Sequence, residues 1–252
     1  MRSPPNACVA TFERVSGLHG SGSIVHAGPG HLDALPEAAT IWIMTVLRIT
    51  SVGAPLNRPG LLAAAMALVR RAVGVGLLPE HDRVDRLDLE LVREIAREAS
   101  SAGVGGDAAV ALLEHRGAAG RRLETLIGQL DAAIAASPVP DRELRALLDV
   151  YDHETLAALL GTSVASLRRY AAGARSVPDV VAGRAHLIAL VTADLAGSYN
   201  EFGLRRWWER PRTALDGRSP REALGRDWSP DGETARIVEG LARGLAGAGG
   251  AT

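Results

Sequence analysis

The sequence contains no lysine, so all 28 of its basic residues are arginine. Ala, Gly, Leu and Val dominate the rest of the chain, and this bias indicates GC-rich coding as one origin of the missing lysine. A second interpretation stays open, because arginine is the better bidentate partner for phosphate and guanine. The absence alone therefore does not distinguish coding bias from nucleic-acid binding.

Cysteine is almost absent as well. Cys8 is the one cysteine in the sequence, which excludes an internal disulfide framework and a cluster of thiolate metal ligands. This usage is typical of a reducing cytoplasm, and we expect a cytoplasmic protein.

Long apolar runs are also missing. The two longest, residues 41–47 and 61–69, are far shorter than the roughly 20 residues that span a bilayer. The N-terminus lacks the ordered basic, apolar and small-residue regions of a signal peptide. We therefore expect no membrane span and a protein that stays inside the cell.

The signatures of catalysis are not found. The seven histidines are scattered, and neither His81 nor His153, each of which is flanked by acidic residues, has a second histidine at a zinc-like spacing. No nucleophile elbow or phosphate-binding glycine loop occurs in a strand-to-helix context. The prediction is a protein that is not an enzyme and needs no cofactor or metal. His186 lies in an apolar run, and we interpret it as a core or interface histidine rather than a ligand.

Helical periodicity dominates the chain after residue 55, so the predicted fold class is all-α. Residues 1–55 are predicted to be a disordered or mis-annotated N-terminus, and Met44 is an alternative start that would exclude residues 1–43. Ile41 to Met44 could form a short strand or a helix turn. Pro138 and Pro140 interrupt the helical pattern and predict a domain boundary. The predicted domains are 1–55, a helical domain 56–137, a DNA-binding domain 141–200 and a C-terminal domain 201–252.

Within the first helical domain, apolar spacing predicts helices over 61–73, from Val84 to Ala99, and through Leu123 to Ile134. Gly103 to Gly106 should stop the second of these helices. Asp107 is the expected N-cap of a short helix that runs to Glu114. The sequence does not indicate what this domain does.

Residues 153–173 read HETLAALLGTSVASLRRYAAG and are the most specific segment of the chain. Their apolar positions fit two short helices that cross steeply and share a small core, which is typical of a helix-turn-helix. Gly161 stands where the first helix should end in a left-handed turn, and Thr162 and Ser163 offer a hydroxyl to cap the second.

The outward face of the second helix carries the predicted DNA contacts. Arginine can hold guanine or phosphate, serine can bond bases or phosphate, and alanine can touch a thymine methyl group. The predicted DNA-binding residues are Ser163, Ala165, Ser166, Arg168, Arg169 and Arg175. The alternative is an ordinary helical hairpin whose arginines are merely solvated.

Local charge favours the DNA-binding interpretation. The whole chain has a formal net charge of -1, which gives no general attraction to a polyanion. Residues 141–162 hold five acidic and two basic residues, whereas residues 163–184 hold Arg168, Arg169, Arg175 and Arg184 against Asp179 alone. Such a small patch gives modest affinity per copy, so we expect a homodimer or a larger oligomer on an operator.

The C-terminal segment 203–245 begins GLRRWWERPRTALDGRSPREALG. Residues 219–222 have the pattern of a helix start: Ser219 can be the N-cap, Pro220 the first helical residue, and Glu222 the acidic third residue of a capping box. Of the adjacent Trp207 and Trp208, one can face the core while the other faces outward as a protein-binding hot spot. The alternative is that both rings pack inside the domain.

The spacing of Trp207, Trp208, Pro211, Arg212, Leu215, Gly217, Pro220 and Leu224, followed by an apolar final helix, resembles the C-terminal domain of the Xre/MbcA/ParS antitoxin family. With the preceding helical pair, the resemblance covers about residues 141–246. Two positions depart from the family pattern: Trp208 stands at a usually aliphatic position, and Arg212 at a usual asparagine. The N-terminal helical half has no counterpart.

The resemblance implies an antitoxin that neutralises a RES-domain toxin, an enzyme that consumes NAD, and that represses its own operon. On this hypothesis the toxin-binding residues are Trp208, Arg210, Arg212, Arg236 and Arg243. The alternative function is a helix-turn-helix transcriptional regulator without a toxin partner.

Overall fold

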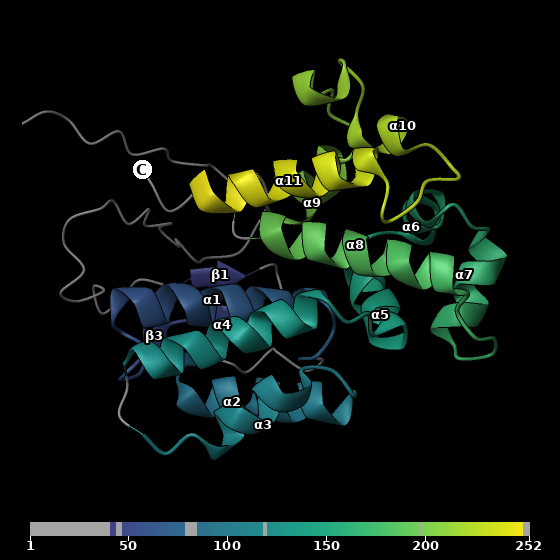
Figure 1. Ribbon diagram of the computed structural model, residues 1–252. Coiled ribbons are helices and arrows are strands. Elements are labelled where there is room, and N and C mark those ends of the chain that lie inside the picture. Colours follow the sequence, from purple (N-terminus) through teal and green to yellow (C-terminus); the bar gives the residue numbers. More distant parts are fainter. Residues whose placement is uncertain (1–40, 44–46, 79–84, 118–119, 197, 249–252) are drawn as a thin grey trace, which may run out of the picture.

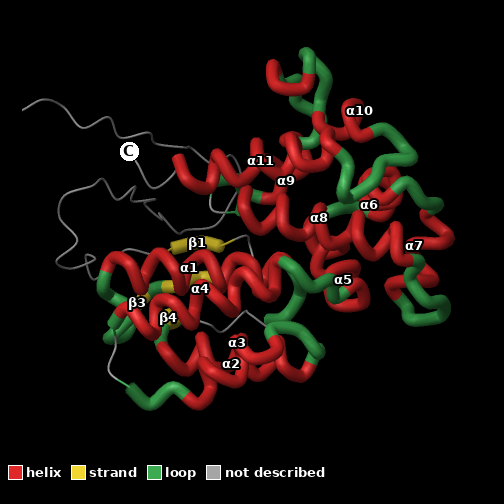
Figure 2. Tube along the Cα trace, viewed as in Figure 1, coloured by secondary structure: helices red, strands yellow, loops and turns green. Residues whose placement is uncertain are grey.

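The computed structural model describes residues 41–43, 47–78, 85–117, 120–196 and 198–248. These residues form eleven α-helices, one 3₁₀ helix and two small two-stranded sheets, which confirms the predicted all-α class (Figures 1 and 2). The helices are α1 Pro59–Gly74, α2 Leu89–Ser101, α3 Gly106–Glu114, α4 Arg121–Ala135, α5 Pro140–Val150, α6 His153–Leu160, α7 Val164–Ala171, α8 Asp179–Leu195, α9 Glu201–Trp207, η1 Thr213–Leu215, α10 Pro220–Leu224 and α11 Glu233–Ala248.

Four short strands precede or interrupt the first helices: β1 Ile41–Ile43, β2 Leu47–Ile49, β3 Ser51–Val52 and β4 Arg86–Leu87. β1 pairs with β2 in an antiparallel hairpin, and β3 pairs with β4 in parallel. Ile49 is fully buried, and the Gly53 amide donates to the Leu87 carbonyl at 2.8 Å.

The prediction that residues 1–55 lie outside the fold was therefore wrong for residues 41–43 and 47–55. The short strand that the sequence left open at Ile41 is present. Its partner strand was missed because three-residue strands are too short for alternation to be recognised. Residues 1–40 and Met44 lie outside the described residues.

Two predicted helix starts are corrected. The helix expected from Val84 begins at Leu89, because Leu87 pairs in β4 and the Asp88 carboxylate caps the amides of Glu90 and Leu91 at 3.0 and 3.2 Å. Asp107 does not cap α3, since that helix begins one residue earlier, after Gly105 at a φ of 82°. Two adjacent glycines make the turn there without a side-chain cap.

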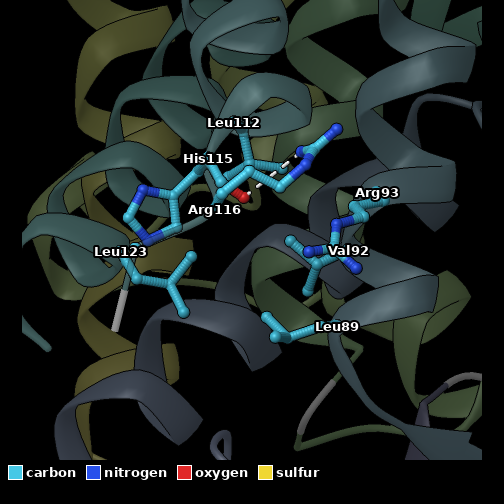
Figure 3. Close-up of a pocket in the computed structure, with 8 residues that line it drawn as sticks. Leu89, Val92, Arg93, Leu112, His115, Arg116 and Leu123 are labelled. Atoms are coloured by element: carbon cyan, nitrogen blue, oxygen red, sulfur yellow. Dashed lines mark hydrogen bonds between the residues drawn. The ribbon is translucent and has the colours of Figure 1, made fainter. Parts of the chain in front are cut away.

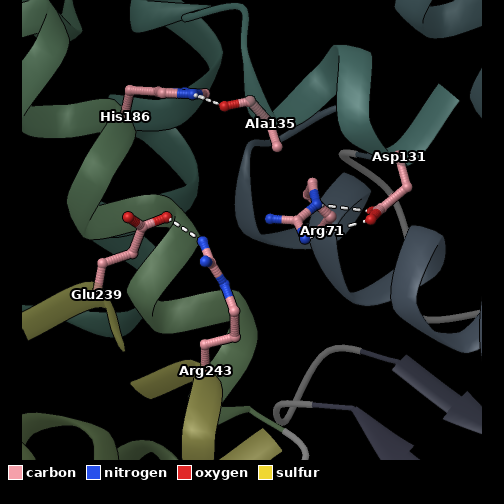
Figure 4. Close-up of polar contacts among 6 residues, drawn as sticks. All are labelled: Arg71, Asp131, Ala135, His186, Glu239 and Arg243. Carbon is pink, nitrogen blue, oxygen red and sulfur yellow. Dashed lines mark hydrogen bonds and ion pairs between the residues drawn. The ribbon is translucent and has the colours of Figure 1, made fainter. Parts of the chain in front are cut away.

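The helices are arranged around α8. α11 packs along one side of it, and α1 and α5 pack on the other (Figure 1). α1 then packs on α4, and α3 lies against both α4 and α2, so the N-terminal helices form the lower layers of the view. An ion pair joins the α1–α4 pair, in which Arg71 Nε donates to Asp131 Oδ1 at 2.6 Å (Figure 4). No helix among the described residues is long and apolar enough to cross a bilayer.

The core continues across the predicted boundary at residues 137–140. α1 and α8 pack so closely that a Cβ on Gly74 would lie 2.7 Å from the Cβ of Ala193. Pro140 does not close a domain but starts α5, where its missing N–H costs nothing in the first helical turn. One hydrophobic core therefore spans the predicted domains 56–137, 141–200 and 201–252, and the division between them does not describe the packing.

His186 adds a buried polar link across the same boundary. Its Nδ1 lies 2.6 Å from Oε1 of the fully buried Glu143 in α5. Its Nε2 lies 2.9 Å from the carbonyl of Ala135 at the end of α4, as Figure 4 shows. Because a carboxylate and a carbonyl both accept, an ionised Glu143 requires both ring nitrogens to carry protons. The prediction of a satisfied core histidine is confirmed.

Candidate nucleic-acid interface

α6 and α7 are held at a tight turn. Asp152 caps α6 by accepting from the Thr155 amide at 2.7 Å, and Gly161 ends it with a φ of 67°. A Cβ on Gly161 would lie 2.2 Å from the carbonyl oxygen of Arg226, so both the backbone conformation and the close approach require glycine. The predicted left-handed turn is confirmed.

Ser163 caps α7 as predicted. Its Oγ accepts from the Ser166 amide at 3.1 Å and donates to the Ser166 hydroxyl at 3.0 Å. The Ser166 hydroxyl keeps its own proton available, since it accepts in this contact. Both serines therefore support the helix start, and Ser166 retains a donor for a further partner.

The two faces of α7 differ in their exposure to solvent. Leu167 and Tyr170 are buried with Leu156 and Leu160 of α6, whereas the opposite face is open to solvent. The exposed predicted residues on and after α7 are Ser163, Ala165, Arg168, Arg169 and Arg175, and Ser166 is half-buried. The structure thus brings the six predicted DNA-binding residues onto one short helix and its two flanks.

Charge on this face comes from three guanidinium groups. In the described part of the chain Arg168 and Arg169 make no ion pair, and Arg175 lies with its guanidinium carbon 5.8 Å from the centre of the Tyr170 ring. A cation above a tyrosine ring is held in place without losing its charge. α7, at the right-hand end of the molecule in Figure 1, therefore presents positive charge that no ion pair compensates.

Arg184 does not belong to this basic face, although the sequence placed it in the same charge run. Only 6% of the residue is exposed. Its Nη1 donates to the Leu160 carbonyl at 2.9 Å and its Nε to the Trp228 carbonyl at 2.8 Å, while its carbon lies 5.4 Å from the Trp228 ring. Burial lowers the pKa of Arg184, and the charge of Asp227 opposes that shift.

Arg184 and Trp228 together hold the C-terminal end of α6. Trp228 Nε1 donates to the Leu159 carbonyl at 2.8 Å, so the last carbonyls of α6 find donors on α8 and on the loop after α10. Unsatisfied carbonyls at a helix end are the groups that most need partners. Sequence reasoning missed this role because the three partners lie 24 to 69 residues apart along the chain.

Trp208 contradicts its predicted role in partner binding. The side chain has no exposed surface, and the rings of Trp207 and Trp208 meet edge to face with centres 5.1 Å apart. Trp208 Nε1 donates to the Tyr151 hydroxyl at 3.0 Å, and that hydroxyl lies 2.9 Å from the Thr192 hydroxyl. Both rings pack inside, as the alternative interpretation had it, with at most 1% of either residue exposed.

The remaining predicted partner residues are distributed over two elements. Arg210, Arg236 and Arg243 are exposed, and Arg243 pairs with Glu239 on the same face of α11 (Figure 4). Arg212 is half-buried, with its guanidinium carbon 5.2 Å from the centre of the Trp207 ring and with Nε and Nη2 covered. Arg212 is therefore less available to a partner than the other three arginines.

The predicted start of α10 is confirmed in detail. Ser219 Oγ accepts from the Glu222 amide, and the Glu222 carboxylate accepts in return from the Ser219 amide at 2.9 Å. These bonds to Ser219 lower the pKa of Glu222.

No metal-binding cluster of three His, Cys, Asp or Glu side chains exists among the described residues. In comparisons with known proteins, no family model, no curated protein and no solved structure matches this chain. The candidate interface therefore rests on the geometry of α6 and α7.

Proposed function

We propose that this protein binds duplex DNA through α7 and regulates transcription. The observation that carries the proposal is the exposed basic face of α7, whose opposite face is buried against α5 and α6, with Arg184 fixing the end of α6. An eight-residue helix held in this way can enter a major groove with Ala165, Ser166 and Arg169 toward base edges and with flanking arginines on phosphates.

The small number of cations sets the expected mode of binding. Three arginines release few counterions, so one copy binds DNA modestly, and its affinity falls with salt by a slope of only about three on a log–log plot. A homodimer or larger oligomer on paired operator half-sites gains the missing affinity. We place this activity in the cytoplasm, and it needs no cofactor, metal or membrane.

The test replaces Arg168 and Arg169 together by alanine. The double variant should lose specific binding to the promoter of its own gene, while the control pair Arg121→Ala with Arg122→Ala binds as the wild type does. Arg121 and Arg122 are also adjacent and exposed, at the start of α4, so they match the lost charge. Gel shifts at several salt concentrations measure affinity and the number of copies per duplex; unchanged affinity of the α7 variant would reject the interface.

A second candidate function, neutralisation of a RES-domain toxin, is supported by the exposed arginines of the C-terminal segment that resembles an antitoxin domain. Arg210, Arg236 and Arg243 could enter a pocket built for an anionic substrate such as NAD. Trp208 is no longer part of this surface. DNA binding would then be autoregulation of a toxin operon.

Charge reversal on α11 tests the second candidate. Arg236→Glu with Arg243→Glu should abolish protection against a co-expressed RES-domain toxin but leave promoter binding intact, because α7 does not contain these positions. Arg121→Glu with Arg122→Glu is the matched control and should protect fully. Growth on co-expression is the readout: full protection by the α11 variant rejects this surface, and loss of both activities indicates unfolding.

A further inference from the structure

A cavity of about 140 Å³ opens between α2, the end of α3 and the start of α4 (Figure 3). Its apolar wall is formed by Leu89, Val92, Leu112 and Leu123, the last three of which are buried. The cavity belongs to the N-terminal half, to which neither proposed function gives a role. It is also remote from α7 in sequence.

The rim of this cavity is polar and carries positive charge. Arg93 is half-buried on α2, and Arg116 is exposed just after α3; both line the cavity, and its lining includes no acidic residue. Arg116 Nη1 donates to the Leu113 carbonyl at 2.6 Å, which leaves its second terminal nitrogen for another acceptor. Within the described residues Arg93 makes no ion pair.

His115 supplies a further unsatisfied group. Its Nε2 is buried and has no hydrogen-bond partner among the described residues, although the ring lines the cavity. A buried polar nitrogen without a partner costs free energy, so it marks a position where an acceptor or a donor is missing. Gly117 stands beside this ring, and a Cβ there would lie 3.0 Å from His115 Cε1.

We propose that this cavity binds a small monocarboxylate whose apolar part is about the size of a benzene ring. An engineered apolar cavity of about 150 Å³ in another protein holds benzene, so a volume of about 140 Å³ suits a ligand of that size. Guanidinium groups recognise carboxylates by paired charged hydrogen bonds, and two of them stand at the rim of an apolar wall. The N-terminal half is then a ligand-sensing unit packed against the core that also supports α7.

Calorimetric titration of the full chain with benzoate tests the proposal, with benzamide as the uncharged molecule of the same shape. Benzoate should bind in a 1:1 ratio, and benzamide about tenfold more weakly or less, because a hydrogen bond to a charged group is worth more than one to a neutral group. Equal affinities for the two molecules would reject carboxylate recognition. Absence of saturable benzoate binding up to roughly 10 mM would reject the site.

Two variants of α2 locate the binding site. Arg93→Gln should weaken benzoate binding about tenfold without changing the melting temperature of the unliganded protein. Arg97→Gln, one turn further along α2, removes an arginine that pairs with Glu90 and does not line the cavity, so its affinity should equal that of the wild type. Equal affinity of the Arg93 variant and the wild type would place any binding elsewhere and overturn the assignment. Since α7 is unchanged in these variants, the outcome is independent of the DNA-binding test.

Discussion

Two arginine-rich regions of this chain look alike in sequence and differ in structure. Around α7, Arg168, Arg169 and Arg175 extend into solvent from a helix whose opposite face is buried. Between α9 and α11, tryptophans occur among the arginines, and Arg212 lies over the Trp207 ring. Arg175 also lies over an aromatic ring, that of Tyr170, but remains exposed, whereas Arg212 is half-buried with Nε and Nη2 covered. An arginine is therefore open to a partner only where its guanidinium group is not enclosed.

The largest expected loss of stability comes from replacing Trp208, in the region where tryptophans occur among the arginines. Trp208→Ala should lower the free energy of unfolding by about 3–5 kcal/mol, because it leaves a large cavity and removes the donor to Tyr151. Urea denaturation measures the loss, and Trp208→Phe, which keeps most of the ring volume, should lose clearly less. A change below about 1 kcal/mol for the alanine variant would mean that the ring is on the surface after all.

Arg184 and Arg168 belong to the same run of basic residues in the sequence, but Arg184 is buried and Arg168 is exposed, so their replacement should change stability by different amounts. Arg184→Ala should cost about 2–4 kcal/mol, since the carbonyls of Leu160 and Trp228 both lose a donor. Arg168→Ala removes an exposed side chain and should stay within about 0.5 kcal/mol of the wild type. Equal stabilities of the two variants, again by urea denaturation, would contradict the buried contacts.

His186 gives the smallest expected effect, and it depends on pH. Burial and the charge of Arg71 lower the pKa of His186, but its bonds to Glu143 and the Ala135 carbonyl outweigh them, so the pKa is raised above that of the unfolded chain. A raised pKa means that the folded state holds the proton more tightly. The stabilisation is therefore complete below the unfolded pKa of about 6.5 and is lost as pH rises through the folded pKa.

Unfolding free energies measured from pH 5 to 9 check this prediction. The difference between the wild type and His186→Gln should shrink as pH rises, on the order of 1.4 kcal/mol for each unit by which the pKa is shifted. A difference that stays constant over this range would show that His186 does not change its protonation between the folded and unfolded states.

The sequence predicted local structure best where neighbours in the chain decide it. The turn at Gly161, the Ser163 cap of α7 and the reciprocal capping of α10 by Ser219 and Glu222 each depend on residues within four positions of one another. The orientation of α7 also followed from its own periodicity, because Leu167 and Tyr170 mark the buried face of a short amphipathic helix.

What lies far apart in the chain was decided by tertiary structure alone. Pro140 signalled the end of one helical pattern, but only the packing of α1 on α8 showed that the core continues past it. Sequence likewise could not tell which arginine or tryptophan would be buried, because Arg184 depends on Leu160 and Trp228, and Trp208 depends on Tyr151. Helix caps and faces are set by short-range hydrogen bonds and periodicity, whereas burial is set by which distant surfaces meet.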